Sequence, residues 1–69
     1  MKKYKIGQKV NVVGIKGEVR LIDNRGYAYV VPEEEYIRYN NFITLKGLVF
    51  TTLDLNGKDV LGNKAKIYK

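Results

Sequence analysis

The side chains that could do chemistry in this 69-residue sequence are lysines, tyrosines, threonines and carboxylates, because histidine, cysteine and serine are absent. Without His or Cys the common zinc and redox-metal sites cannot be built, so we predict no metal and no cofactor. Thr44, Thr51 and Thr52 are conceivable nucleophiles, but none has an evident activating partner. The sequence therefore predicts a protein that is not an enzyme and has no small-molecule substrate.

A group of basic and aromatic side chains is the strongest binding candidate, since cations engage phosphates and aromatic rings stack on bases. If Val19 and Leu21 face the core together with Ala28 and Val30 of the next strand, their neighbours point outward. The predicted nucleic-acid-binding residues are Arg20, Tyr27 and Tyr29 on that face, Arg25 and Lys16 in nearby loops, and Lys2, Lys3 and Lys5 in the amino-terminal arm. In the alternative, Tyr27 and Tyr29 form the core face and Ala28 points outward.

Two acidic stretches are weaker candidates. We interpret Glu33–Glu35 as a solvated first helical turn rather than a site for a cation or a basic partner. The stretch "DLNGKD", residues 54–59, loosely resembles a calcium loop but lacks the further acidic ligands that such a loop needs. We interpret it as a hairpin.

The net charge of +6 is unevenly distributed along the chain. Residues 1–16 hold five basic and no acidic side chains, residues 17–35 hold two basic and five acidic ones, and residues 36–69 hold six basic and two acidic ones. Basic ends around a mildly acidic middle favour a polyanion as partner. The same charge also serves solubility alone.

The first half of the chain has the pattern of a β meander. Val10 and Val12 alternate with polar residues, as in a half-buried strand over 9–13. A glycine-bounded connection over 14–17 leads to an antiparallel strand over 18–23. The turn "DNRG", with Gly26 at positive φ, leads to a third strand over 27–31.

The pattern changes after Pro32. A proline followed by three glutamates favours a short helical or 3₁₀ turn near residues 32–39. The alternative is a loop running into a strand over 36–39. We predict further strands over 42–45 and 48–55, and a two-residue turn at Asn56-Gly57 that places Leu53 opposite Val60. A short last strand follows within 64–69, with Ala65 and Ile67 facing inward.

Together these elements predict one all-β domain over residues 1–69, a small barrel of five to seven short antiparallel strands, with residues 1–6 as a candidate flexible basic arm. The stretch "KIGQKVNVVGIKGEVRLIDNRGYAYVV" resembles the opening of Src-homology-3-like barrels of the KOW and Tudor kind. The matching positions are Gly7, Val10, Val12, Gly17, Val19, Ile22, Tyr29 and Val31. The resemblance implies involvement with ribosomes, RNA polymerase or nucleic acid.

We therefore expect a small basic protein that binds DNA or RNA through backbone charge with little sequence specificity. The alternative is a protein-interaction module, an adapter or inhibitor of phage or mobile-element origin, which uses Tyr27, Tyr29 and exposed strand edges. The first function requires the basic ends to converge on one face, and the second requires a large apolar patch. No apolar run has the length of a signal peptide or a membrane span, which favours a soluble, cytoplasmic protein.

Overall fold

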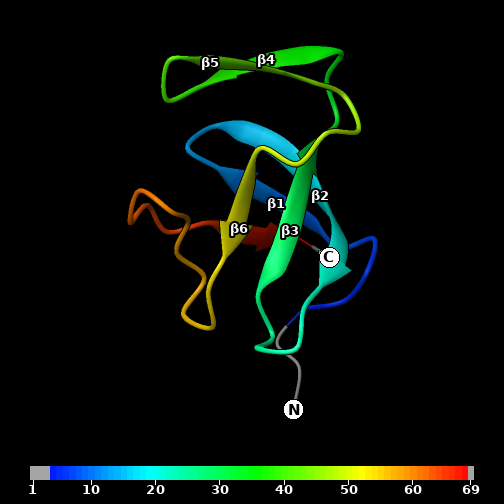
Figure 1. Ribbon diagram of the computed structural model, residues 1–69, viewed down its shortest axis with the longest axis vertical. Coiled ribbons are helices and arrows are strands. Elements are labelled where there is room, and N and C mark those ends of the chain that lie inside the picture. The colour runs from blue at the N-terminus through cyan, green and yellow to red at the C-terminus, as the bar shows by residue number, and fades with distance from the viewer. Residues whose placement is uncertain (1–3, 69) are drawn as a thin grey trace.

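The computed structural model describes residues 4–68, which form seven β-strands in two antiparallel sheets (Figure 1). The larger sheet is curled and has the order β6-β3-β2-β1-β7, and the hairpin β4-β5 lies across one end of it. The strands are β1 (Lys9–Val12), β2 (Ile15–Ile22), β3 (Ala28–Pro32), β4 (Tyr36–Tyr39), β5 (Phe42–Leu45), β6 (Thr51–Leu53) and β7 (Lys66–Tyr68). The prediction of an all-β domain with five to seven short strands is confirmed.

The core is built from the inward faces of the strands, from one residue before β1 and from the residue that directly precedes β7. Its buried members are Tyr4, Val10, Val12, Val19, Ala28, Val30, Ile37, Tyr39, Leu53 and Ala65. Ala28 and Val30 are fully buried, so the interpretation that placed Tyr27 and Tyr29 in the core is wrong. Tyr4 is 2% exposed, so the packed part of the chain begins within the predicted basic arm.

A β-bulge in β2 overturns the predicted orientation of Leu21. Val19 lies opposite Val30 and Leu21 lies opposite Tyr29, which leaves Arg20 as an extra residue in β2. An extra residue shifts the alternation of side chains by one. Leu21 is therefore exposed, and Ile22 packs against the core in its place.

The connection between β1 and β2 is shorter than the predicted 14–17 loop. Val12 pairs with Ile15, so only Val13 and Gly14 form the turn, and both have positive φ. Two residues with positive φ give the tight hairpin whose twist matches that of the strands. Lys16, predicted in a loop, consequently lies within β2.

The predicted helical turn at residues 32–39 is wrong, and the alternative of a loop leading into a strand is confirmed. Residues 33–35 form bends, and β4 follows with alternating exposure that buries Ile37 and Tyr39. Asn40 and Asn41 have φ of 49° and 69° and close a two-residue turn into β5. Alternate residues of a strand lie on the same face, so a strand buries Ile37 and Tyr39 together. Residues two positions apart in a helix lie on different faces.

Three loops share one geometry and one sequence pattern, Asp-x-x-Gly-x, over residues 23–27, 54–58 and 59–63. In each loop the Asp N–H donates to the carbonyl of the fifth residue, and the Gly N–H donates to the Asp carbonyl. The Asp Oδ1 accepts the N–H groups of the third and fifth residues. Each glycine has positive φ, between 81° and 88°, which confirms the prediction for Gly26. We call these loops the Asp turns.

The second Asp turn replaces the predicted two-residue turn at Asn56-Gly57. Asp54 pairs with Lys58, which shifts the register by one and removes the predicted pairing of Leu53 with Val60. Val60 instead lies in the third Asp turn, where it is exposed. Of the two side chains predicted to face inward near the end, Ala65 is buried and Ile67 is exposed, because β7 is an edge strand. Residues 4–68 contain no helix of the length and apolarity that a membrane span requires.

Candidate nucleic-acid interface

The predicted basic and aromatic face is organised around Asp23 of the first Asp turn. The Arg25 guanidinium lies 2.8 Å from Asp23 Oδ2 and stacks over the Tyr27 ring at 4.3 Å. The Tyr29 hydroxyl donates to the same Asp23 oxygen at 3.2 Å. The hydrogen bond from Arg25 lowers the pKa of Asp23, with desolvation opposing and the turn N–H groups adding to the shift. Arg25 and one face of Tyr27 are therefore engaged within the protein.

Arg20 belongs to a different group of charges. Its Nε lies 3.4 Å from Glu18, and Glu18 also accepts from Lys9 Nζ at 3.2 Å. Lys9 lies 3.5 Å from Glu33 as well, and the hydrogen bond to Glu18 is the main cause of its raised pKa. The acidic middle of the chain thus neutralises Arg20 and Lys9.

The structure does not place all of the predicted site residues on one surface. It brings Arg25, Tyr27 and Tyr29 together, while Lys16 lies near the opposite end of β2, beside the β1–β2 turn. Lys5 is exposed just before β1. Lys2 and Lys3 lie outside the described residues.

A second basic group, largely missed by the sequence prediction, crosses the edge of the larger sheet. Asn11 of β1 pairs with Lys16 of β2 on one side and with Lys66 of β7 on the other. Residues that pair directly across strands project from the same face of a sheet. Lys64 and Lys66 line a hollow together with Asn11, Val13 and Gly14. We call Lys16, Lys64, Lys66 and Asn11 the lysine surface.

The lysine surface carries uncompensated positive charge. All three lysines are exposed, and none has an ion-pair partner within residues 4–68. No acidic side chain from the described part of the chain lines the hollow. Asn11 Oδ1 accepts the Gly14 N–H at 2.9 Å, which leaves the side-chain amide N–H groups as donors. The arrangement offers cations and a neutral donor to an anion.

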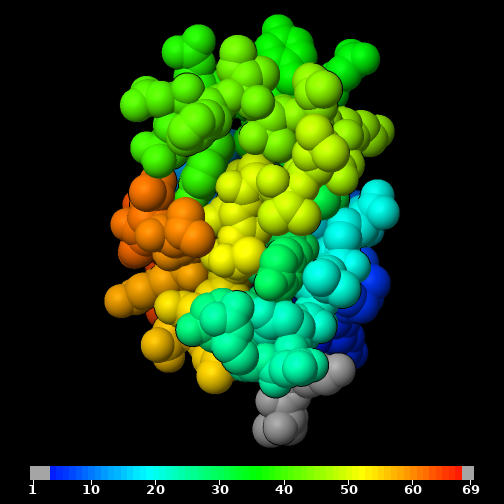
Figure 2. Space-filling view, in the orientation of Figure 1, coloured from blue at the N-terminus to red at the C-terminus, as the bar shows by residue number. Residues whose placement is uncertain are grey.

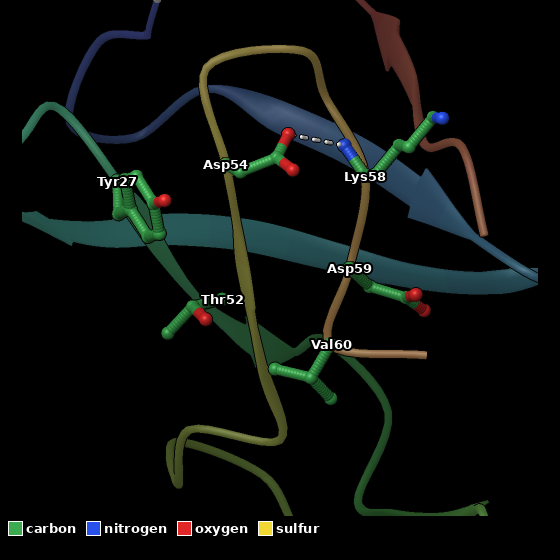
Figure 3. A pocket seen from close by; sticks show the side chains of 6 residues that line it. All are labelled: Tyr27, Thr52, Asp54, Lys58, Asp59 and Val60. Carbon is green, nitrogen blue, oxygen red and sulfur yellow. Dashed lines mark hydrogen bonds between the residues drawn. The ribbon is translucent and has the colours of Figure 1, made fainter. Parts of the chain in front are cut away.

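The acidic residues of the predicted calcium-like stretch have structural roles. Figure 3 shows Asp54 and Asp59 beside a shallow pocket that Tyr27, Thr52, Lys58 and Val60 complete. Asp54 accepts the Lys58 N–H, and Asp59 Oδ2 accepts the Tyr39 hydroxyl at 2.6 Å. Among the described residues, no group of three or more His, Cys, Asp or Glu side chains could hold a metal ion.

Seven large apolar side chains on the hairpin β4-β5 and the segments beside it are exposed, which was not predicted from the sequence. They are each at least 50% exposed: Tyr36, Phe42, Ile43, Leu45, Leu48, Val49 and Val60. We call them the hairpin surface; most of it is the green and yellow-green end of the molecule in Figure 2. The two consecutive asparagines before "FITL" were the available indication of a short separate hairpin, because Asn tolerates positive φ.

No protein-family model, curated protein or solved structure matches this chain.

Proposed function

We propose that the protein binds nucleic acid through the lysine surface, by contact with backbone phosphates and with little sequence specificity. The observation that carries the proposal is that one lysine of the first basic segment and two lysines of the last one lie on the same surface. Lys16 comes from the first basic segment, and Lys64 and Lys66 come from the last one. They meet because β7 pairs with β1 and β1 pairs with β2.

The charge balance favours the lysine surface over the predicted arginines. A cation that already has a carboxylate partner must give up that interaction to engage a phosphate. Arg20 and Arg25 have such partners, and the three lysines have none among the described residues. Asn11 adds a hydrogen-bond donor that suits a phosphate oxygen.

The resemblance to Src-homology-3-like barrels of the KOW and Tudor kind gives secondary support. The strands β1, β2 and β3, which contain most of the matching positions, form a continuous meander within a curled antiparallel sheet. Membership of that family is part of the proposal.

The test is a salt titration of binding to labelled single-stranded and duplex oligonucleotides. The logarithm of affinity should fall linearly with the logarithm of salt concentration. The slope is about −0.9 per neutralised phosphate on duplex and about −0.7 on single strands. Replacing Lys16, Lys64 or Lys66 by Gln should reduce the slope by about one contact per substitution.

Arg25→Gln is the matched control, because it removes the same formal charge from a side chain already paired with Asp23. We expect it to leave the slope unchanged. If the lysine variants keep the full slope and Arg25→Gln or Arg20→Gln reduces it, the interface lies on the originally predicted face. Absence of binding to either oligonucleotide below about 100 μM at low salt, well within the usual range for non-specific binding, would remove the proposal.

A further inference from the structure

We infer that the hollow beside the β1–β2 turn receives one unpaired nucleotide, with its base against Val13 and its flanking phosphates on Lys64 and Lys66. The inference rests on the proposed function and narrows the ligand of the lysine surface to a single strand. Three features of the hollow carry it: the size of the space, the unpaired cations along one wall, and the apolar end formed by a strained residue.

The hollow lies between the tip of the hairpin β1-β2 and the chain around the start of β7. Its lining residues come from β1, the hairpin tip and the start of β7: Asn11, Val13, Gly14, Lys64 and Lys66. They surround about 320 Å³ of space. Sites for small ligands usually measure about 300–1,000 Å³, so this hollow is near the lower end of the range. A space of this size suits one nucleotide rather than a base pair.

Cations and a hydrogen-bond donor form one wall of the hollow. Lys64 and Lys66 are exposed and have no ion-pair partner within residues 4–68. Because the Asn11 Oδ1 already accepts the Gly14 N–H, the amide N–H groups of Asn11 are the part available to a ligand oxygen. Two cations and an amide donor match the phosphates on either side of a nucleotide.

The carboxylates on neighbouring segments do not neutralise this wall. Glu18 and Glu33 both lie within 3.5 Å of Lys9. Asp59, in the loop before Lys64, is buried and accepts hydrogen bonds within the protein. Two further exposed carboxylates belong to the connection between β3 and β4, those of Glu34 and Glu35. None of these side chains lines the hollow, so a phosphate there meets no like charge from the walls.

Val13 gives the hollow an apolar end at a cost in stability. Its φ of 47° is unfavourable for a β-branched residue, and its side chain is 53% exposed rather than packed in the core. Strained backbone conformations cluster at ligand-binding sites, where the strain is retained for function. Next to two unpaired lysines, this exposed side chain can cover the face of a base while the phosphates engage the cations.

The base must be unpaired to reach Val13. In a duplex both faces of each base are covered by its neighbours, so a side chain in a groove contacts base edges. In a single strand the faces are accessible, and apolar side chains pack against them. The contact with Val13 therefore favours single strands without selecting among the four bases, because every base has such a face.

The test compares a labelled oligothymidine with a strand of the same length made of abasic sites, which carries the same phosphates without bases. We expect the oligothymidine to bind at least about threefold more tightly, roughly the effect of burying one methylene-sized apolar group. Val13→Asn and Val13→Gly should both remove this difference and leave the salt slope unchanged. Asn and Gly suit the turn conformation, so both variants should fold, and thermal unfolding checks this.

Two controls and one direct measurement locate the contact. Val60→Asn removes another exposed valine outside the lysine surface and should leave the preference for oligothymidine within twofold of the wild type. A duplex of the same length should bind the wild type and both Val13 variants equally. In the wild-type complex, nuclear Overhauser effects should connect the Val13 methyl protons to thymine protons.

The outcomes separate the inference from the proposed function. If Lys64→Gln and Lys66→Gln leave the salt slope unchanged, the proposed function is removed, and the inference with it. If those variants reduce the slope but oligothymidine and the abasic strand bind equally, the proposed function stands and the contact of a base with Val13 is overturned. If Val13→Asn weakens duplex and single-strand binding equally, the unpaired nucleotide is overturned, because Val13 would then contact a groove.

Discussion

Val13 is a β-branched residue in the left-handed region, with a φ of 47° and a side chain 53% exposed. That conformation costs roughly 1–2 kcal/mol for an L-residue, and the exposed side chain recovers little of it by burial. Asn is the residue that this turn position favours before glycine. We expect Val13→Asn to raise the free energy of unfolding by about 1 kcal/mol. Urea unfolding should show a higher midpoint with an unchanged m-value.

Val60→Asn is the matched control for this prediction. Val60 is also an exposed valine in a turn, but its φ is negative, so its replacement relieves no strain. A change within about 0.5 kcal/mol is expected, as for ordinary surface substitutions. An equal gain from both substitutions would show that removal of an exposed valine, rather than relief of strain at Val13, is the cause.

Asp59 is a buried carboxylate whose oxygens are all engaged. Oδ1 accepts the N–H groups of Leu61 and Asn63, and Oδ2 accepts the Tyr39 hydroxyl. Burial raises the pKa of Asp59, but the hydrogen bonds from Tyr39, Asn63 and Leu61 together outweigh it and bring the pKa below its ordinary value of 3.8. Burial, followed by the bond to Asp59, raises the pKa of Tyr39.

The lowered pKa of Asp59 predicts a loss of stability in acid. A carboxyl whose pKa is lower in the folded state stabilises the fold fully above its unfolded pKa, and this contribution disappears as the pH falls through the folded value. Asp59→Asn should cost about 1–3 kcal/mol at pH 7, because a buried hydrogen-bond network is left incomplete. It should also flatten the pH dependence below about pH 4. Urea unfolding between pH 7 and pH 2 measures both effects.

Tyr39→Phe separates the charge of Asp59 from the packing of the ring. It removes one hydrogen bond to the carboxylate and keeps the aromatic contact with Phe50. The pKa of Asp59 should rise toward its unfolded value, so the loss of stability in acid should be smaller and should end at a higher pH than in the wild type. An unchanged acid profile in Tyr39→Phe and Asp59→Asn would assign the acid sensitivity to other carboxylates, Asp23 first.

Among the elements, those with strong local patterns were predicted correctly. The alternation in β1 and the "DNRG" turn are encoded in a few adjacent residues. The bulge at Arg20 has no local indication, because it depends on how β2 pairs with β3. The helical turn was wrong for a related reason: Pro32 and the glutamates favour a helix locally, but burial of Ile37 and Tyr39 requires an extended chain.

Two local patterns predict different turns at residues 54–58, and the structure contains the Asp turn. Asn-Gly favours a two-residue turn, but Asp54 two residues earlier satisfies three backbone groups of a longer loop. The matching pattern at Asp23 and Asp59 was visible in the sequence and would have corrected the register of the second half. The pattern Asp-x-x-Gly was thus a better predictor here than the dipeptide alone.

For the whole molecule, the sequence indicated that both ends are basic but not which cations would remain unpaired. The lysine surface depends on the pairing of β7 with β1, which joins residues more than fifty positions apart. The predicted arginines are less available to a phosphate, because Arg25 pairs with Asp23 and Arg20 pairs with Glu18. The hairpin surface arises because a separate two-stranded sheet buries only part of its apolar residues.

The glycines of the Asp turns make the fold sensitive to chirality. Gly62 has a φ of 88°, and a Cβ of L-configuration there would meet no atom of residues 4–68 within 4 Å, so the expected cost of L-alanine is conformational. A D-amino acid favours the mirror-image region, where this φ is relaxed. In a chain assembled by chemical ligation, D-alanine at position 62 should stabilise the protein by about 0.4–1 kcal/mol, and L-alanine should destabilise it by about 1 kcal/mol. Thermal unfolding of the two stereoisomers, which have identical composition, would measure what handedness alone contributes to one turn.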